Sequence, residues 1–147
     1  NMNDASTRIE NYCYQLGLAL GLAFQTQDDL LDLIGTPDTT GKTLFADLRD
    51  GTHTLFTQYI FECGNEKERM ELRQILGSNV GAEDRNRVLD LFQRSGALAH
   101  GRAQVEQYLQ KSQNLIDSGP LCREARDGFN HLIEVLRQRD THWRVEH

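Results

Sequence analysis

Apolar residues recur at intervals of three and four along most of the chain, the spacing that places side chains on one face of an α-helix. No stretch shows the alternation of apolar and polar residues that is typical of strands, and only two prolines, Pro37 and Pro120, interrupt the pattern. The sequence therefore predicts an all-α fold. The helices are expected at about residues 5–34, 55–63, 66–76, 83–117 (with a bend at Gly96) and 121–139.

The first predicted helix, residues 5–34, contains two glycines in its interior. Asp4 or Ser6 is its expected N-cap. Gly17 and Gly21 lie four residues apart, where each glycine costs about 1 kcal/mol relative to alanine. We therefore expect another helix or a ligand to approach this helix closely at the two glycines.

Three carboxylates lie near the C-terminal end of the same helix, in FQTQDDLLDLIG (residues 24–35). Asp28 and Asp32 are one turn apart on one face, and Asp29 lies about a quarter-turn away. Like charges at this spacing repel, and the helix dipole disfavours negative charge at this end. Oxygen ligands suit Mg²⁺ before Ca²⁺ or Zn²⁺, and Mg²⁺ usually completes its shell with water and phosphate oxygens. The cluster indicates a magnesium site for a phosphorylated ligand, with simply solvated acids as the alternative.

The following loop, TPDTTGKTLFADLRDGTHT (residues 36–54), adds a cation, Lys42, and a further acid, Asp47. Its GKT triplet does not form a P-loop, because that motif needs a glycine where Thr36 stands and a buried strand before it. A calcium-binding EF-hand is excluded as well, because leucines occupy positions where its loop needs oxygen ligands.

Composition narrows the classes of function. The 147 residues are 38% hydrophobic and 26% charged, which is typical of a globular domain. The net charge of −6 argues against a nucleic-acid surface. No apolar run reaches the roughly 18 residues of a membrane span. Cys13, Cys63 and Cys122 are far apart and odd in number, which indicates free thiols in a reducing compartment.

The remaining charged and titratable residues suggest no further site. The five histidines show no ligand spacing and are interpreted as surface or core residues. Arg137, Arg139 and Arg144 form a basic tail, expected to be a solvated helix end matched to the dipole.

Two longer segments resemble a known family. LGLALGLAFQTQDDLLDLIG (residues 16–35), followed by GKTLFADLRDGTHTL (41–55), resembles the second aspartate-rich motif and following loop of the trans-prenyltransferases. These are the farnesyl, geranylgeranyl and longer polyprenyl diphosphate synthases, whose pattern is LGxAFQxxDDxLDxxG and then GKxxGxDLxxGKxTLP. The resemblance continues through SGALAHGRAQVEQYLQKSQNLI (95–116) and the last helix, so that it covers the whole chain.

The resemblance implies an all-α isoprenoid synthase type I helical bundle around a central cavity, with residues 1–147 as the C-terminal half of one synthase domain. It implies Mg²⁺-dependent head-to-tail condensation of isopentenyl diphosphate with an allylic diphosphate, in a cytoplasmic homodimer without a transmembrane segment or nucleic-acid partner.

The resemblance also implies roles for single residues. Lys42 would hold the allylic diphosphate, and Phe24 and Gln25 would lie beside the substrates together with Asp47. Core packing for Phe24, and structural hydrogen bonds for Gln25 and Asp47, remain alternatives. The metal-binding acids of the motif correspond to Asp28, Asp29 and Asp32.

The chain departs from the family pattern at three positions and in its extent. Phe45 replaces a glycine, Thr52 replaces a lysine and Phe56 replaces a proline. The family's first aspartate-rich motif is absent, so we expect these residues alone to be inactive and to need the remainder of the synthase chain. A non-catalytic regulatory subunit of a heteromeric synthase is the alternative. A terpene cyclase fits less well, because its second metal motif usually has an Asn/Asp-Ser/Thr-Glu form.

Overall fold

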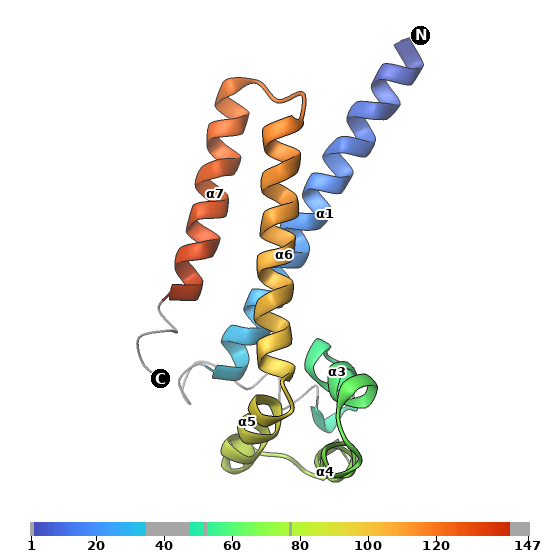
Figure 1. The fold of residues 1–147 in the computed structure, drawn as a ribbon, viewed down its shortest axis with the longest axis vertical. Helices are drawn as coiled ribbons and strands as arrows, with labels where there is room; N and C mark the ends of the chain where they lie inside the picture. Colours follow the sequence, from blue (N-terminus) through green and yellow to red (C-terminus); the bar gives the residue numbers. More distant parts are fainter. Residues whose placement is uncertain (1, 35–47, 52, 77, 142–147) are drawn as a thin grey trace. The chain divides into compact units, whose positions relative to one another are not determined.

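The structure, a computed structural model, describes residues 2–34, 48–51, 53–76 and 78–141 (Figure 1). Within these residues every regular element is a helix and no strand occurs, which confirms the all-α prediction. The elements are α1 (Met2–Ile34), α3 (Leu55–Cys63), α4 (Glu66–Leu76), the 3₁₀ turn η1 (Ala82–Asp84), α5 (Arg85–Arg94), α6 (Ala97–Ser118) and α7 (Arg123–Thr141).

The chain divides into two compact units. Unit 1 comprises Asn1–Gln25 with Val105–His147, and unit 2 comprises Thr26–Gln104, so that α1 and α6 each contribute residues to both. In unit 1, α7 lies antiparallel beside the C-terminal part of α6 (Figure 1). Its core is formed by small and branched apolar side chains from three helices, which are Leu16, Ala19, Leu20, Ala23, Val105, Leu109, Ile116, Ile133 and Leu136.

A hydrogen bond from α1 holds the end of α6 in unit 1. The hydroxyl of Tyr12 donates a hydrogen bond to the backbone oxygen of Leu115, 2.9 Å away. A Cβ atom at Gly119 would lie only 2.1 Å from the Tyr12 oxygen, so a side chain here would force the Tyr12 ring to move. α6 ends at Ser118 and α7 begins at Arg123, so the interruption predicted at Pro120 is confirmed, and close packing as well as turn chemistry accounts for the glycine.

Side-chain caps define the first two helices of unit 2. Thr54 and Thr57 form a reciprocal capping box at the start of α3. At the start of α4, the backbone N–H of Asn65 donates to the Glu68 carboxylate (2.9 Å), and the N–H of Glu68 donates to the Asn65 side chain (3.0 Å). Each pair satisfies N–H groups that the first turn of a helix leaves without partners. Both helices have the bounds predicted from the sequence.

Phe56, one of the departures from the family pattern, lies in the centre of unit 2. Its side chain is fully buried, and its ring is 5.6 Å from that of Phe92 on α5. Gly101 on α6 makes room for it, because a Cβ there would come within 2.8 Å of the Phe56 ring and 3.4 Å of Leu30. The phenylalanine thus serves as a core residue that connects α3, α5, α6 and the last turns of α1.

Two expectations about helix ends are wrong. The long helix predicted for 83–117 is interrupted, because Gly96 has φ of +85°, which an α-helix cannot accommodate. Asp4 and Ser6 do not cap α1: they lie inside it, paired with Arg8 (3.2 Å) and Glu10 (3.1 Å).

The two glycines of α1 have no close neighbour among the described residues. A Cβ at Gly17 or at Gly21 would meet nothing within 4 Å, and both positions are exposed. The predicted close approach therefore does not come from the described part of this chain.

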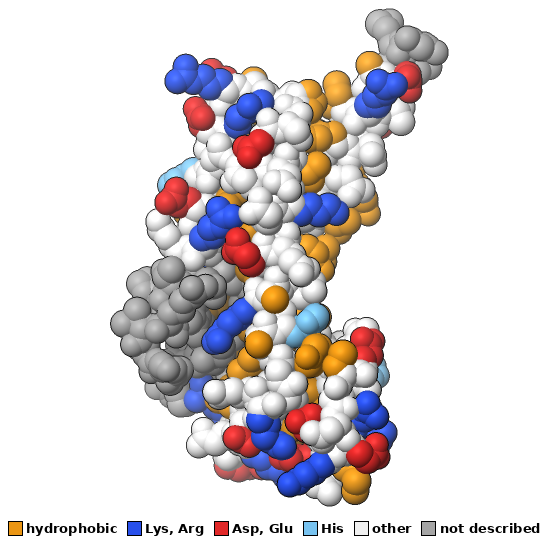
Figure 2. Space-filling model, viewed as in Figure 1, with side chains coloured by type: hydrophobic (Ala, Val, Ile, Leu, Met, Phe, Trp, Pro, Cys, Tyr) orange, Lys and Arg blue, Asp and Glu red, His pale blue; other side chains and the backbone are white. Residues whose placement is uncertain are grey.

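The exposed side of α1 in unit 1 is apolar. Figure 2 shows hydrophobic side chains along α1, and the segment from Asn11 to Gln27 contains no charged residue. The large exposed side chains include Tyr14 (64% exposed), Leu18 (40%), Leu22 (37%) and Phe24 (47%). None of the described helices combines the length and low polarity needed to cross a bilayer.

Candidate functional site

Four of the predicted site residues are described, and all four lie on α1. Phe24 and Gln25 belong to unit 1 and are exposed, whereas Asp28 and Asp29 belong to unit 2 and are half-buried. Asp32 lies within the same helix, but its side chain is outside the described residues.

The loop half of the prediction cannot be placed in space. Lys42 and Asp47 lie outside the described residues, as do the departures Phe45 and Thr52. Their predicted roles stay predictions.

The packing of α1 into unit 2 sets the direction of the carboxylates. Leu30 and Leu33 are buried, at 5% and 2% exposure, and anchor one side of the helix in the core. Because each residue turns the helix by about 100°, Asp28 lies about 160° away from Leu30, on the opposite side. The apolar anchor therefore turns Asp28 away from the core of unit 2.

The charge balance at this end of α1 suits a cation. The last turn of the helix carries no basic side chain, while its unpaired carbonyl groups disfavour negative charge nearby. Asp28 and Asp29 provide carboxylate oxygens, which are the ligands that Mg²⁺ prefers. The described residues contain no group of three or more His, Cys, Asp or Glu side chains that could hold a metal. Asp28 and Asp29 are of the ligand type that Mg²⁺ prefers, and together with Asp32 they remain the predicted magnesium site.

Phe24 forms a cation–π contact with Arg139, an arginine that was expected to be solvated. The guanidinium carbon of Arg139, in the last turn of α7, lies 5.0 Å from the centroid of the Phe24 ring. The expectation that Arg139 belongs to a solvated helix end is therefore wrong. No local pattern could have shown the contact, because the two residues are far apart in the sequence and meet only in the folded unit 1.

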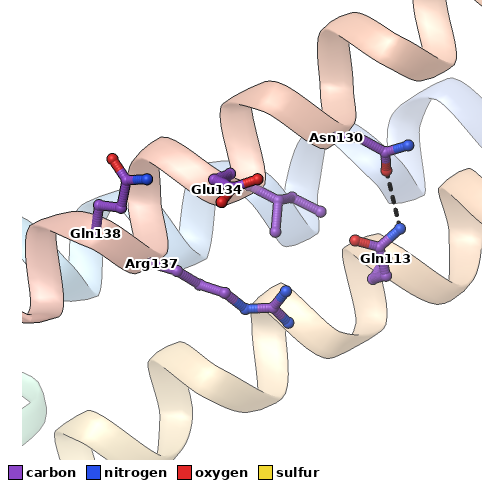
Figure 3. A pocket seen from close by; sticks show the side chains of 6 residues that line it. Gln113, Asn130, Glu134, Arg137 and Gln138 are labelled. Atoms are coloured by element: carbon purple, nitrogen blue, oxygen red, sulfur yellow. Dashed lines mark hydrogen bonds between the residues drawn. The ribbon is translucent and has the colours of Figure 1, made fainter.

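A pocket lies between α6 and α7 in unit 1, and the predicted site residues do not line it. It encloses about 370 Å³, and Figure 3 shows side chains of both helices around it, with the Gln113 amide donating to Asn130 at 2.9 Å. Arg137, beside it, pairs with Glu106 at 3.4 Å. Its lining residues are Gln113, Asn130, Ile133, Glu134, Arg137 and Gln138, none of which was predicted to bind substrate.

Two histidines of unit 2 make aromatic contacts, in keeping with their interpretation as structural residues. His100 stacks on Tyr59, with ring centroids 4.5 Å apart, and His53 meets the edge of Phe61 at 6.1 Å. The three cysteines, Cys13, Cys63 and Cys122, are exposed free thiols.

Comparison with known proteins gives relatives of one kind. The chain is 29% identical over 136 residues to a geranylfarnesyl diphosphate synthase of Aeropyrum pernix, covering 92% of this chain and 42% of that protein. It is 28% identical over 127 residues to the heptaprenyl diphosphate synthase component 2 of Geobacillus stearothermophilus, covering 86% of this chain and 38% of the relative. The chain thus spans about two-fifths of the length of these relatives.

A solved structure shares the fold. The geranylgeranyl pyrophosphate synthase from Lactobacillus brevis superposes with a TM-score of 0.68 at 23% identity, covering 88% of this chain and 41% of that one. The prediction of an isoprenoid synthase helical fold is confirmed. The family model described as polyprenyl synthetase matches residues 1–93, a segment that includes the whole carboxylate motif and its loop. Since this match covers more than half of the chain, the chain belongs to the polyprenyl synthetase family.

Proposed function

We propose that this chain is the C-terminal half of a polyprenyl diphosphate synthase and carries the second aspartate-rich motif of that enzyme. The observation that carries the proposal is the cluster Asp28-Asp29-Asp32 near the C-terminal end of α1, inside the segment matched by the family model. The reaction is the head-to-tail joining of isopentenyl diphosphate to an allylic diphosphate. The allylic C–O bond breaks, a C–C bond forms, and diphosphate and one proton are released.

The residues of the motif act on the leaving diphosphate. Asp28, Asp29 and Asp32 would hold Mg²⁺, which when bound stabilises the negative charge that develops as the C–O bond breaks. Lys42 supplies a further positive charge for the allylic diphosphate. Gln25 and Asp47 would lie beside the substrates, where the Gln25 side chain can form a hydrogen bond.

The apolar side of α1 supports the proposal that the rest of the synthase packs against this chain. An exposed helix face that lacks charges over Asn11 to Gln27 is unusual for a surface in water. The relatives are more than twice as long as the aligned segment, so they have additional chain that can cover such a face. In this proposal the remainder supplies the first aspartate-rich motif, the 147 residues alone are inactive, and the intact enzyme is a cytoplasmic homodimer.

A second candidate is a non-catalytic subunit of a two-component synthase. Thr52 stands where the family pattern has a lysine, which removes one positive charge from the diphosphate-binding loop. Relatives from Geobacillus stearothermophilus and Bacillus subtilis are named component 2 of a heptaprenyl diphosphate synthase, a name that supports a two-component assembly and does not say which component is catalytic. The complete set of three aspartates favours the catalytic assignment.

The deciding experiment measures prenyl transfer by the protein encoded with its upstream sequence. Turnover of isopentenyl diphosphate with an allylic diphosphate is expected only with Mg²⁺, and Asp28→Asn should lower kcat at least about 100-fold, in the range for loss of one charge-stabilising group. Asp4→Asn, at the exposed start of α1, is the matched control and should keep full activity. Metal-independent turnover, or unchanged turnover in Asp28→Asn, would refute the assignment.

A non-catalytic subunit gives a different result in the same assay. It would show no turnover alone and would gain activity only when mixed with a catalytic partner. In that case Asp28→Asn would leave the activity of the mixture unchanged.

A further inference from the structure

The contact between Arg139 and Phe24 joins two helix segments of unit 1 that are distant in the sequence. The guanidinium carbon lies 5.0 Å from the ring centroid, inside the roughly 6 Å range of cation–π contacts. Phe24 is 47% exposed, so part of its surface remains accessible to solvent beside the guanidinium. The contact is thus made at the surface of the unit, on a residue that the family pattern places beside the substrates.

The end of α7 is anchored so that Arg139 can reach α1. Ile133 and Leu136, at 1% and 3% exposure, bury the same helix in the core of unit 1. Arg139 follows Leu136 by three residues and therefore lies next to this buried side, where it is half-buried. A cation in the last turn of a helix is also favoured by the dipole. Core packing therefore determines the side of α7 on which Arg139 lies.

A cation over one ring face limits the movement of an exposed phenylalanine. Phe24 lacks the surrounding contacts that hold a core residue in one rotamer, and the planar guanidinium supplies a covering surface on one side. A side chain already held in its binding orientation loses less freedom when a ligand arrives.

We propose that Arg139 is a positioning residue for a prenyl diphosphate substrate, acting by holding the Phe24 ring in the orientation that meets the hydrocarbon part of that substrate. This inference rests on the function proposed above. It adds a residue from the last helix, outside both aspartate-rich motifs, to the determinants of substrate binding.

The test is a double-mutant cycle in the intact synthase. KM is first measured for both diphosphate substrates in Phe24→Leu, and the substrate whose KM rises is the one that depends on the Phe24 ring. Arg139→Gln should raise the same KM by about two- to fivefold, the range for an exposed cation–π contact, with kcat unchanged. In the Phe24→Leu background, Arg139→Gln should have no further effect. Arg139→Lys keeps the charge but not the planar stacking and should raise KM less than Arg139→Gln does.

Arg137→Gln is the matched control, since it also removes one arginine from this part of α7. Arg137 pairs with Glu106, whereas Arg139 contacts Phe24. Its KM should equal that of the wild type. Three results would overturn the proposal: an unchanged KM in Arg139→Gln, an equal rise in the Phe24→Leu background, or a fall in kcat with KM unchanged.

The same variants separate this inference from the proposed function. Absence of turnover in the wild-type protein and in its mixtures contradicts the proposed function. Thermal unfolding of the four proteins of the cycle tests the contact without catalysis, and additive shifts of Tm would refute it there too.

Discussion

Replacing Gly21 by alanine tests both the structure of α1 and the proposal that another part of the synthase covers it. Gly21 lies in the interior of a 33-residue helix, and a Cβ there meets nothing within 4 Å. No steric cost offsets the gain in helix propensity, which is about 1 kcal/mol for glycine to alanine. With a urea m-value of about 2 kcal/mol/M, the unfolding midpoint of this chain should rise by about 0.5 M.

The measurement is urea unfolding of the 147-residue chain followed by circular dichroism. Gly128→Ala is the control, since that glycine is exposed on α7 and also has no neighbour within 4 Å of a Cβ. Both variants should gain similar stability. A lower midpoint for Gly21→Ala alone would refute the reasoning, because it would show that a part of this chain contacts α1 at that glycine.

The same pair of variants carries the test to the intact synthase. If additional helices pack against the apolar side of α1, the Cβ at position 21 meets them, and overpacking costs about 1–3 kcal/mol. Gly21→Ala should then lose its advantage or become destabilising, while Gly128→Ala keeps its gain. Equal stabilisation by both substitutions in the longer protein would contradict the proposed packing.

Three further predictions concern contacts within the two units. Phe56→Ala should lower the free energy of unfolding of unit 2 by about 3–5 kcal/mol, because it removes a fully buried ring, whereas Leu22→Ala on the exposed side of α1 should cost less than about 1 kcal/mol in the same urea titration. Tyr12→Phe should cost about 1 kcal/mol by removing the hydrogen bond to Leu115. Burial is the main cause that raises the pKa of the Tyr12 hydroxyl, and the charge of Cys13 raises this pKa further. The folded state therefore favours the protonated phenol. The stability that this preference contributes is fully present below the pKa of the unfolded state, near 10. It is lost as the pH rises through the higher pKa of the folded state. Unfolding measured between pH 8 and 11 should show this loss in the wild type and a flatter profile in Tyr12→Phe.

Helix bounds were predictable wherever the signals were local. Residues 55–63 and 66–76 were predicted with their final bounds, and in the structure threonine and asparagine caps within four residues stabilise both helix starts. Gly96 was recognised as a weak point of the predicted helix at 83–117. Its φ of +85° separates α5 from α6 completely, and this value depends on how unit 2 packs around it.

The sequence predicted which side chains form the candidate site, but only partly which side chains contact them. The spacing of Asp28, Asp29 and Asp32 places them on the last turns of α1, and the helix is confirmed. Arg139 was misassigned, because a basic residue near a helix end has the same local pattern whether it faces water or a distant ring.

The sequence by itself determined the helical class, most of the helix bounds and the family, because periodicity, capping and motif spacing are properties of neighbouring residues. Only the tertiary structure decided that Gly119 makes room for Tyr12, that Phe56 fills the core of unit 2 beside Gly101, and that Arg139 covers Phe24. These contacts join residues that are far apart along the chain. Their geometry depends on which helix faces are buried together, and that arrangement is settled by the packing of the whole unit.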